Sequence, residues 1–238
     1  MRTFPFFLFL SLASALHAQS DAPSLQEKID QLKSANRAKA TPEKLAAYED
    51  GIKDVVTAKV VESARKVGDL APDFTLHDAK GNTVTLSEEL KNGPVVLTWY
   101  RGGWCPYCNV QLAAYQQILP QIEELGARLI AVSPELPDKA MATAEKGHLK
   151  FTVVSDLNLK VAAEYGLVFA LTPEVAELYS AFFSMKEYNG AEASSNELPL
   201  AATYVISPDG KIVYSFLHAD YTKRAEPREI LAALDRIE

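Results

Sequence analysis

The stretch that decides the fold runs from Gly93 to Leu119 and reads GPVVLTWYRGGWCPYCNVQLAAYQQIL. Its apolar, β-branched beginning, Val95 to Tyr100, predicts a buried central strand. The sequence Arg101-Gly102-Gly103 ends this strand, and a helical pattern follows the motif Cys105-Pro106-Tyr107-Cys108. We therefore expect a strand, a glycine turn, a Cys-x-x-Cys motif and a helix in direct succession.

The two cysteines stand at the predicted start of this helix. Pro106 suits the first helical position, because its missing N–H needs no partner there, so Cys105 is expected at the N-cap. Free backbone N–H groups and the helix dipole favour a thiolate at that place, which predicts a pKa for Cys105 below the usual value of about 8.5. Cys108 is expected to be the more buried thiol. A disulfide that closes so short a loop stabilises little, so the pair predicts redox chemistry in which Cys105 attacks and Cys108 resolves.

Length and composition indicate a globular protein with one well-buried domain and an appendage. The chain has 238 residues and a net charge of −7. This acidic balance, without a basic cluster, argues against nucleic-acid binding. Two cysteines are too few for a disulfide scaffold, and a single Cys-x-x-Cys leaves a structural zinc site two ligands short. We therefore expect neither a metal nor another cofactor.

The first 18 residues have the pattern of a secretory signal peptide. A positive start at Met1-Arg2 is followed by an apolar run from Phe4 to Leu16, and small residues predict cleavage after Ala15 or Ala18. The run is short for a bilayer span, with an uncleaved anchor as the alternative. We expect a mature protein that is exported, periplasmic or secreted, without stable membrane association. In an oxidising compartment its cysteine pair needs a reducing partner.

Residues 19–66 are predicted to form a helical extension before a domain at 67–238. Ser24 to Arg37 is expected as an amphipathic helix with Ser24 and Glu27 as a capping box, and Thr41-Pro42 begins a second helix. The second helix has a modest apolar stripe, which favours packing on the domain over a dimerisation arm. A homodimer remains an open alternative. The stripe consists of Leu45, Tyr48, Ile52, Val55, Val56 and Val60.

Strands alternate with helices along the rest of the chain. Pro120 is expected to kink or restart the helix after the cysteines, and Val168 to Leu171 is ambiguous. Residues 188–196 are predicted as a loop. The order predicts an α/β fold of three layers, with a mixed central sheet and helices on both faces. The predicted strands are Phe74–Leu76, Val84–Leu86, Val95–Tyr100, Ala127–Val132, Thr152–Ser155, Ala202–Ser207 and Ile212–Leu217; the helices are Pro137–Gly147, Leu159–Tyr165, Pro173–Phe183 and Glu226–Ile237.

Several of these stretches together resemble the peroxiredoxin-like branch of the AhpC/TSA family, which has a thioredoxin-like fold. The resemblance implies reduction of hydrogen peroxide or organic hydroperoxides. In that case Cys105 is the peroxidatic cysteine and becomes a sulfenic acid. Cys108 resolves it to a disulfide, which a thioredoxin-like donor reduces. The resemblance extends from about Ala40 to Ile237 and is carried by Phe74 to Leu86, YRGGWCPYC, Ala131 to Pro134, Ala202 to Ile206, and Asp220 to Arg224.

Three positions depart from the family pattern. Typical peroxiredoxins place a Thr or Ser three residues before the peroxidatic cysteine and a Pro seven before it, where this chain has Gly102 and Thr98. Ala201 stands where peroxiredoxins carry an Arg and thioredoxins often a cis-Pro. Tyr100 or a backbone N–H is expected to replace the missing hydroxyl. Arg101 is expected to supply positive charge to a developing leaving oxygen.

For other residues near the motif, the sequence leaves more than one role open. Trp104 is expected to shield Cys105, to form a docking surface or to pack on the domain, and Arg224 is a candidate to reach the site from the last connection. His77 and His148 are expected to be ordinary surface or packed histidines. Two further functions stay open: an exported dithiol–disulfide oxidoreductase on the same fold, and a copper-handling protein in which His218 is the third ligand.

Overall fold

The computed structural model describes residues 23–193 and 196–237. The predicted signal peptide at residues 1–18 lies outside these described residues. Within them, no helix combines the length and the apolar character that a membrane crossing requires.

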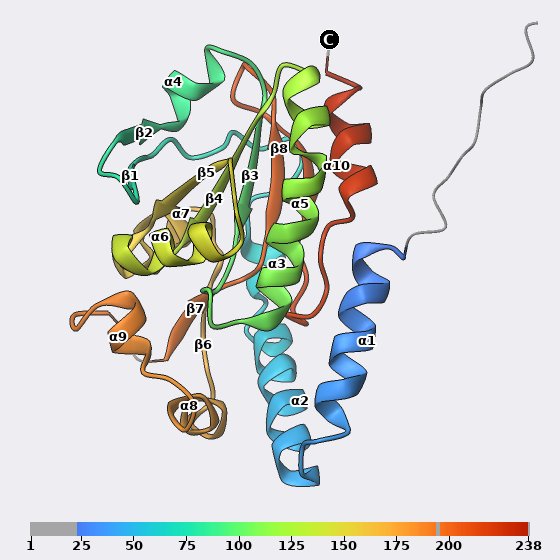
Figure 1. Cartoon of the computed structure of the whole chain (residues 1–238), viewed down its shortest axis with the longest axis vertical. Helices are drawn as coiled ribbons and strands as arrows, with labels where there is room; N and C mark the ends of the chain where they lie inside the picture. The colour runs from blue at the N-terminus through green and yellow to red at the C-terminus, as the bar shows by residue number, and fades with distance from the viewer. Residues whose placement is uncertain (1–22, 194–195, 238) are drawn as a thin grey trace, which may run out of the picture.

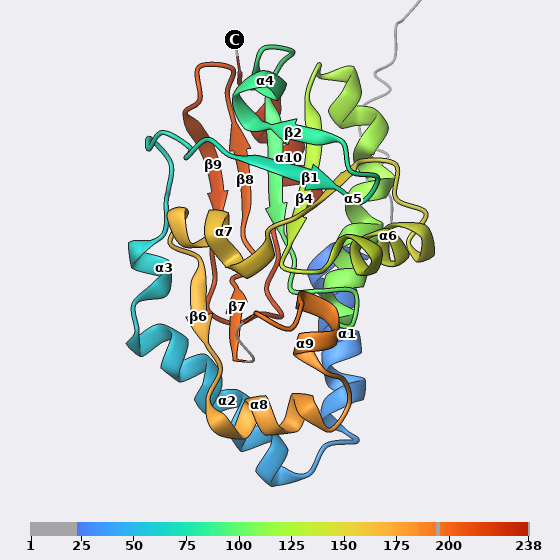
Figure 2. The same cartoon turned by 90° about the vertical axis from the view of Figure 1, so that its left-hand side faces the viewer.

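A mixed seven-stranded sheet forms the centre of the protein (Figures 1 and 2). The three central strands of the sheet run parallel to one another, and every other pair of neighbouring strands is antiparallel. The strand before the glycine turn lies inside the sheet with all its residues buried, as the apolar run predicted. From edge to edge the strands are β2 (Thr83–Thr85), β1 (Thr75–Asp78), β5 (Thr152–Ser155), β4 (Arg128–Ser133), β3 (Val95–Trp99), β8 (Thr203–Ile206) and β9 (Ile212–Phe216).

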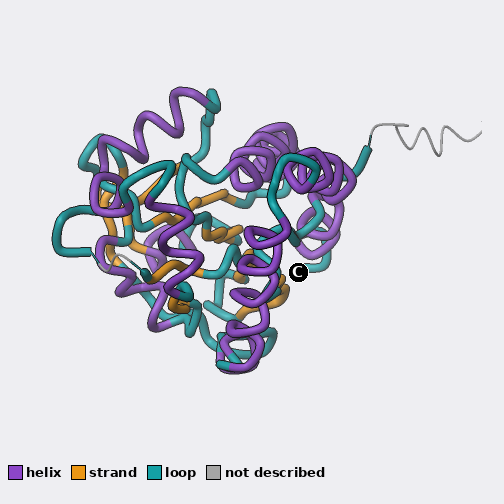
Figure 3. The backbone as a smooth tube through the Cα atoms, turned by 90° about the horizontal axis from the view of Figure 1, so that it is seen from below, coloured by secondary structure: helices purple, strands orange, loops and turns teal. Residues whose placement is uncertain are grey.

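Helices cover both faces of this sheet, so the predicted three-layer α/β arrangement is confirmed (Figure 3). Each face has its own apolar core. On one face lie α1 (Leu25–Arg37), α5 (Pro106–Glu124), α6 (Pro137–Lys146) and α10 (Pro227–Leu234). On the other lie α3 (Val60–Ser63), α4 (Leu86–Leu90), the 3₁₀ turn η1 (Leu157–Leu159) and α7 (Lys160–Glu164).

Two expectations about the middle of the chain are corrected. Helix α5 continues through Pro120, so the predicted restart is wrong, and the predicted kink stays a prediction. Proline removes one backbone hydrogen bond, but Leu119 and Ile122 beside it are buried and hold the helix on the sheet. The ambiguous stretch after Leu167 is the strand β6 (Val168–Ala170), which pairs with β7 (Glu197–Pro199). The helices α8 (Pro173–Ser180) and α9 (Met185–Asn189) connect them, so the predicted loop at 188–196 begins inside a helix.

The N-terminal helices pack on the domain, as the apolar stripe predicted. The capping box of Ser24 and Glu27 is present. The carboxylate of Glu226 accepts hydrogen bonds from the backbone N–H groups of Leu25 and Gln26, at 3.1 and 2.8 Å. Leu25 and Ile29 are buried in the same core as α5. Helix α1 is therefore fixed beside the helix that carries the cysteines.

Helix α2 (Pro42–Thr57) lies against α8, with Thr41 as its cap. Its predicted stripe is wrong at Val56, which is 54% exposed. The helix ends at Thr57, and Lys59 with a φ of +54° turns the chain before Val60. The homodimer stays a prediction.

Replacing Ile29 with alanine should lower the free energy of unfolding by about 2–4 kcal/mol, because it leaves a cavity in a fully buried contact between α1 and α5. Urea unfolding followed by circular dichroism measures the difference. Gln31→Ala, at an exposed position of the same helix, is the control and should change stability by less than about 0.5 kcal/mol. An Ile29→Ala protein as stable as this control would show that α1 is not part of the core.

Candidate active site

The turn between β3 and α5 requires both of its glycines. Gly102 has a φ of +146°, and a Cβ there would lie 2.3 Å from Nε1 of Trp104. A Cβ at Gly103 would lie 2.1 Å from Oγ1 of Thr143. Side chains are therefore excluded at both positions. The chain turns closely enough to place Cys105 at the N-cap of α5, with Pro106 at the first helical position, as predicted.

Both cysteines are reduced and buried inside the protein. Cys105 borders a cavity of about 570 Å³, which we call the Cys105 cavity. Cys108 lies in the first turn of α5 and is completely buried. Its sulfur is 3.5 Å from the backbone nitrogen of Arg101 and 3.5 Å from Nη2 of Arg224. Cys108 is thus the sulfur with direct N–H donors.

The N–H donors around Cys108 favour this sulfur over Cys105 as the site of the negative charge. Burial alone would raise its pKa, but the hydrogen bond from Cys105 and the guanidinium groups of Arg224 and Arg101 outweigh burial and lower the pKa of Cys108 to about 5. Burial and the hydrogen bond to Cys108 raise the pKa of Cys105 well above its ordinary value. This direction is opposite to the low pKa that the helix dipole predicted for Cys105.

A buried hydrogen-bond network holds Arg224 in place. Its Nε donates to Oε1 of Gln111 at 2.5 Å, and its Nη1 donates to the backbone carbonyls of Tyr221 and Lys223. Nε2 of Gln111 donates in turn to Oγ1 of Thr98 at 2.9 Å. The candidate Arg224 thus does reach the site. Gln111 was not predicted, although a polar side chain on the apolar face of a helix was a signal that could have identified it.

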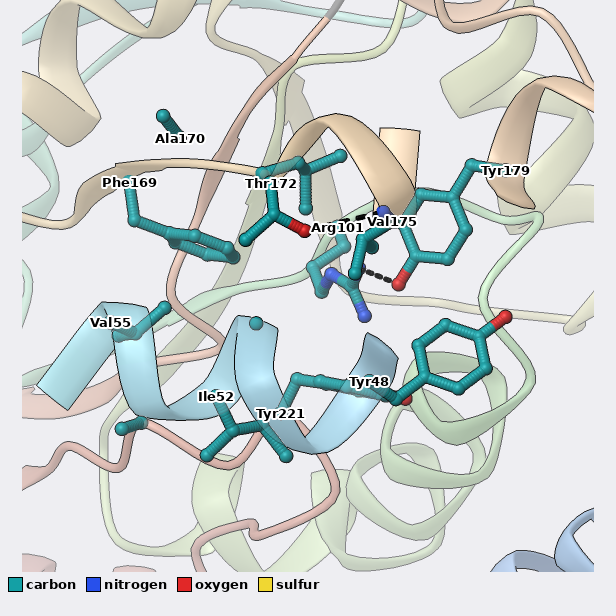
Figure 4. Close-up of a pocket in the computed structure, with 13 residues that line it drawn as sticks. Tyr48, Ile52, Val55, Arg101, Phe169, Ala170, Thr172, Val175, Tyr179 and Tyr221 are labelled. Carbon is teal, nitrogen blue, oxygen red and sulfur yellow. Dashed lines mark hydrogen bonds between the residues drawn. The ribbon is translucent and has the colours of Figure 1, made fainter. Parts of the chain in front are cut away.

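Arg101 is a buried cation surrounded by aromatic rings. Its guanidinium carbon lies 5.1, 5.4 and 4.4 Å from the ring centres of Trp104, Tyr179 and Tyr221. Its Nη2 donates to the hydroxyl of Tyr179 at 2.5 Å, between α2 and α8 (Figure 4). Among the described residues no carboxylate forms an ion pair with Arg101, and its Nε has no acceptor. Its positive charge is therefore available to the thiol pair, which fits the role expected for it.

Tyr100 is engaged by a buried carboxylate. Its hydroxyl donates to Oε2 of Glu135 at 2.9 Å, and Oε1 of Glu135 accepts from the backbone N–H of Gly103 at 2.9 Å. Burial raises the pKa of Glu135. This bridge fixes the glycine turn. It favours a positioning role for Tyr100 over the expected role, in which its hydroxyl orients the peroxide. Glu135 is a site residue that was not predicted from the sequence.

Trp104 forms part of the wall of the Cys105 cavity. Its ring stacks on Phe183 with 4.2 Å between the ring centres, and lies 5.4 Å from the ring of Tyr179. Of the roles expected for Trp104, this position favours shielding of Cys105. The aromatic residues of α8 and of the segment after it were not predicted at the site.

Among the described residues, none is grouped with the two cysteines as the third ligand that the copper-handling alternative requires. Nδ1 of His218, the expected ligand, accepts the backbone N–H of Asp220 at 2.9 Å. Over residues 23–193 and 196–237, no three His, Cys, Asp or Glu side chains are grouped as metal ligands. The same part of the chain contains no cis peptide bond, so Ala201 lies in an ordinary trans backbone.

Replacing Arg224 with methionine should raise the pKa of the Cys108 thiol by at least about one unit, because the variant removes the guanidinium group that contacts the sulfur of Cys108. In the unmodified protein the thiolate is present above about pH 5 and is lost below it. The ultraviolet absorbance of the thiolate, followed against pH, measures both values. Arg236→Met removes an exposed arginine and should leave the titration unchanged. Identical titrations of the two variants would contradict the role of Arg224.

Two kinds of peroxiredoxins are similar in sequence to this chain. Chloroplastic peroxiredoxin Q of Populus jackii is 33% identical over 116 residues, which cover 49% of this chain and 52% of that protein. Peroxiredoxin Bcp of Escherichia coli is 28% identical over 151 residues, covering 63% of this chain and 85% of that protein. The chain spans about half the length of the plant relatives that it matches.

Solved structures agree on the fold. Peroxidoxin BcpB from Mycobacterium tuberculosis superposes with a TM-score of 0.57 at 24% identity, covering 73% of this chain and 98% of that one. Peroxiredoxin Q from Xanthomonas campestris superposes with a TM-score of 0.52 at 18% identity, covering 68% of this chain and 89% of that one. The fold is therefore the thioredoxin-like fold of peroxiredoxins. The sequence model of the AhpC/TSA family matches residues 67–215, which include the glycine turn and both cysteines. Since this match spans more than half of the sequence, the chain belongs to the AhpC/TSA family.

Proposed function

We propose that this protein is a thiol-dependent peroxidase that reduces hydrogen peroxide or organic hydroperoxides through Cys108 and Cys105. The observation that carries the proposal is the pair of 3.5 Å contacts that the sulfur of Cys108 makes with Nη2 of Arg224 and the backbone nitrogen of Arg101. They favour a thiolate at neutral pH, which is the reactive form of cysteine. Membership of the AhpC/TSA family and the similarity to peroxiredoxins Q and Bcp support the same activity.

In this proposal Cys108 attacks and Cys105 resolves, the reverse of the order expected from the sequence. The thiolate is the nucleophile, and Cys105 keeps its proton. With Cys108 as the peroxidatic residue, the position three before it is Cys105, whose S–H donates a hydrogen bond to it. A thiol thus replaces the hydroxyl that typical peroxiredoxins place there, and Gly102 is no longer a departure.

The reaction balances with the groups that the site provides. The Cys108 thiolate attacks the terminal peroxide oxygen, so that an S–O bond forms, the O–O bond breaks, and the alkoxide or hydroxide leaves and takes a proton from solvent. The guanidinium groups of Arg101 and Arg224 stabilise the charge that moves from sulfur to the leaving oxygen. The sulfenic acid then condenses with the Cys105 thiol, forming a disulfide and releasing water. Two electrons from an external dithiol restore both thiols.

The peroxide reaches the site through the Cys105 cavity. Cys105 borders this cavity, whereas Cys108 is completely buried beside it. The proposal therefore includes a rotation of the Cys105 side chain that admits the terminal oxygen. Closing the disulfide afterwards requires no large rearrangement, because Cys105 at the N-cap and Cys108 in the first turn belong to the same end of α5.

The location and the reductant are parts of the same proposal. The amino-terminal pattern at residues 1–18 supports export to the periplasm or the outside of the cell. An oxidising compartment makes an external reductant necessary, and a thioredoxin-like protein has the dithiol chemistry that the disulfide needs.

Replacing Cys108 with serine should slow the first turnover of the reduced protein with hydrogen peroxide by at least about 100-fold, because the attacking sulfur is lost. Cys105→Ser, the matched control, should retain the attack and accumulate a sulfenic acid. Stopped-flow fluorescence measures both rates, since Trp104 adjoins Cys105 in the chain and stacks on Phe183.

Two results would overturn parts of the proposal. A fast reaction in Cys108→Ser that disappears in Cys105→Ser would assign the attack to Cys105. An unmodified protein that reacts with peroxides no faster than a free thiol, yet exchanges rapidly with protein disulfides, would be a dithiol–disulfide oxidoreductase.

A further inference from the structure

The Cys105 cavity is large enough for a small organic molecule. Its volume of about 570 Å³ falls within the usual range of ligand pockets. Part of its wall is Tyr48 and other residues of the α1–α2 region, and Tyr221 adds to it from the other end of the chain. These residues lie outside the matched family region at 67–215. Part of the wall of this cavity therefore comes from segments outside the matched region.

The lining of the cavity is rich in aromatic rings. Seven of the lining side chains are aromatic. Trp104 stacks on Phe183, and Tyr179 lies against both rings in a tilted arrangement. Phe182 at the same wall is 72% exposed. Such rings favour an apolar body of aromatic size over water or a bare peroxide.

All the charged residues that line the cavity are cations. They are Lys39, Lys44 and Arg101, and no lining residue is an Asp or Glu, although the net charge of the chain is −7. Within the described part of the chain none of the three forms an ion pair. The ammonium of Lys44 lies over the ring of Phe182 at 5.5 Å. The lining thus offers positive charge without a negative partner.

Two buried N–H donors in this lining also lack acceptors. They are Nε of Arg101, whose side chain is almost completely buried, and Nε1 of Trp104. Buried donors in proteins are nearly always paired.

We propose that the Cys105 cavity selects organic hydroperoxides that combine an apolar body of aromatic size with an anionic group such as a carboxylate. The apolar body packs on the rings of Tyr48, Trp104 and Phe183, and the anionic group lies near Lys39 and Lys44. This inference rests on the proposed peroxidase function and names its substrate class. The chemical steps are those of the proposed reaction, with the alkoxide of this hydroperoxide as the leaving group.

Three matched peroxides test the inference: cumene hydroperoxide, its para-carboxylate derivative and the methyl ester of that derivative. The readout is kcat/KM of the full-length protein for each peroxide with a chemical dithiol as reductant. The carboxylate should exceed its methyl ester by about three- to five-fold at low salt. This advantage should shrink as salt is added, because exposed charges are screened. In the double variant Lys39→Gln/Lys44→Gln the ratio of carboxylate to ester should fall towards one.

The control is Lys53→Gln, which removes the same charge from an exposed position of helix α2 and should preserve the ratio. Equal kcat/KM values for carboxylate and ester, or a ratio that survives in the double variant, overturn the inference while the peroxidase function stands. If the protein reduces neither these three peroxides nor hydrogen peroxide faster than a free thiol does, the proposed function is overturned, and the inference is overturned with it.

Discussion

The interaction on which the site depends is the attraction between the charges of two buried guanidinium groups and a pair of buried thiols. Among the described residues neither Arg101 nor Arg224 forms an ion pair with a carboxylate, and both are almost completely buried. A buried cation without a counterion is costly. A thiolate on Cys108 offsets this cost and is itself stabilised by both arginines. Charge balance inside the protein thus produces the reactive sulfur.

The surrounding structure serves to hold these charges in position. Gln111 and Thr98 link Arg224 to helix α5 and strand β3, so the arginine is tied to the same elements that carry the cysteines. Glu135, two residues after strand β4, fixes the glycine turn through Tyr100 and Gly103. The carboxylate binds the turn and forms no ion pair with either arginine among the described residues, which leaves their charge to the thiols.

The local parts of this site were predictable from the sequence, and the long-range parts were not. Apolar periodicity and the proline at the first helical position located β3, the turn and the start of α5. The helix dipole alone favoured Cys105 as the attacking residue, whereas the contacts of Cys108 favour the reverse order that we propose. A dipole contributes about 0.3–1 kcal/mol, whereas Arg224 touches Cys108 across 116 residues of sequence. No spacing rule reveals such a contact. The exposed Val56 and the uninterrupted helix at Pro120 likewise depend on packing that local patterns do not contain.

The location of the negative charge is the central claim, and the Cβ chemical shifts of the two cysteines measure it directly. In reduced protein labelled with ¹³C-cysteine, these shifts are followed by NMR from acid to alkaline pH. The Cys108 signal should move from the thiol to the thiolate position with a midpoint near 5, while the Cys105 signal stays that of a thiol through neutral pH. A Cys105 signal that titrates first would contradict the account and return the attack to Cys105.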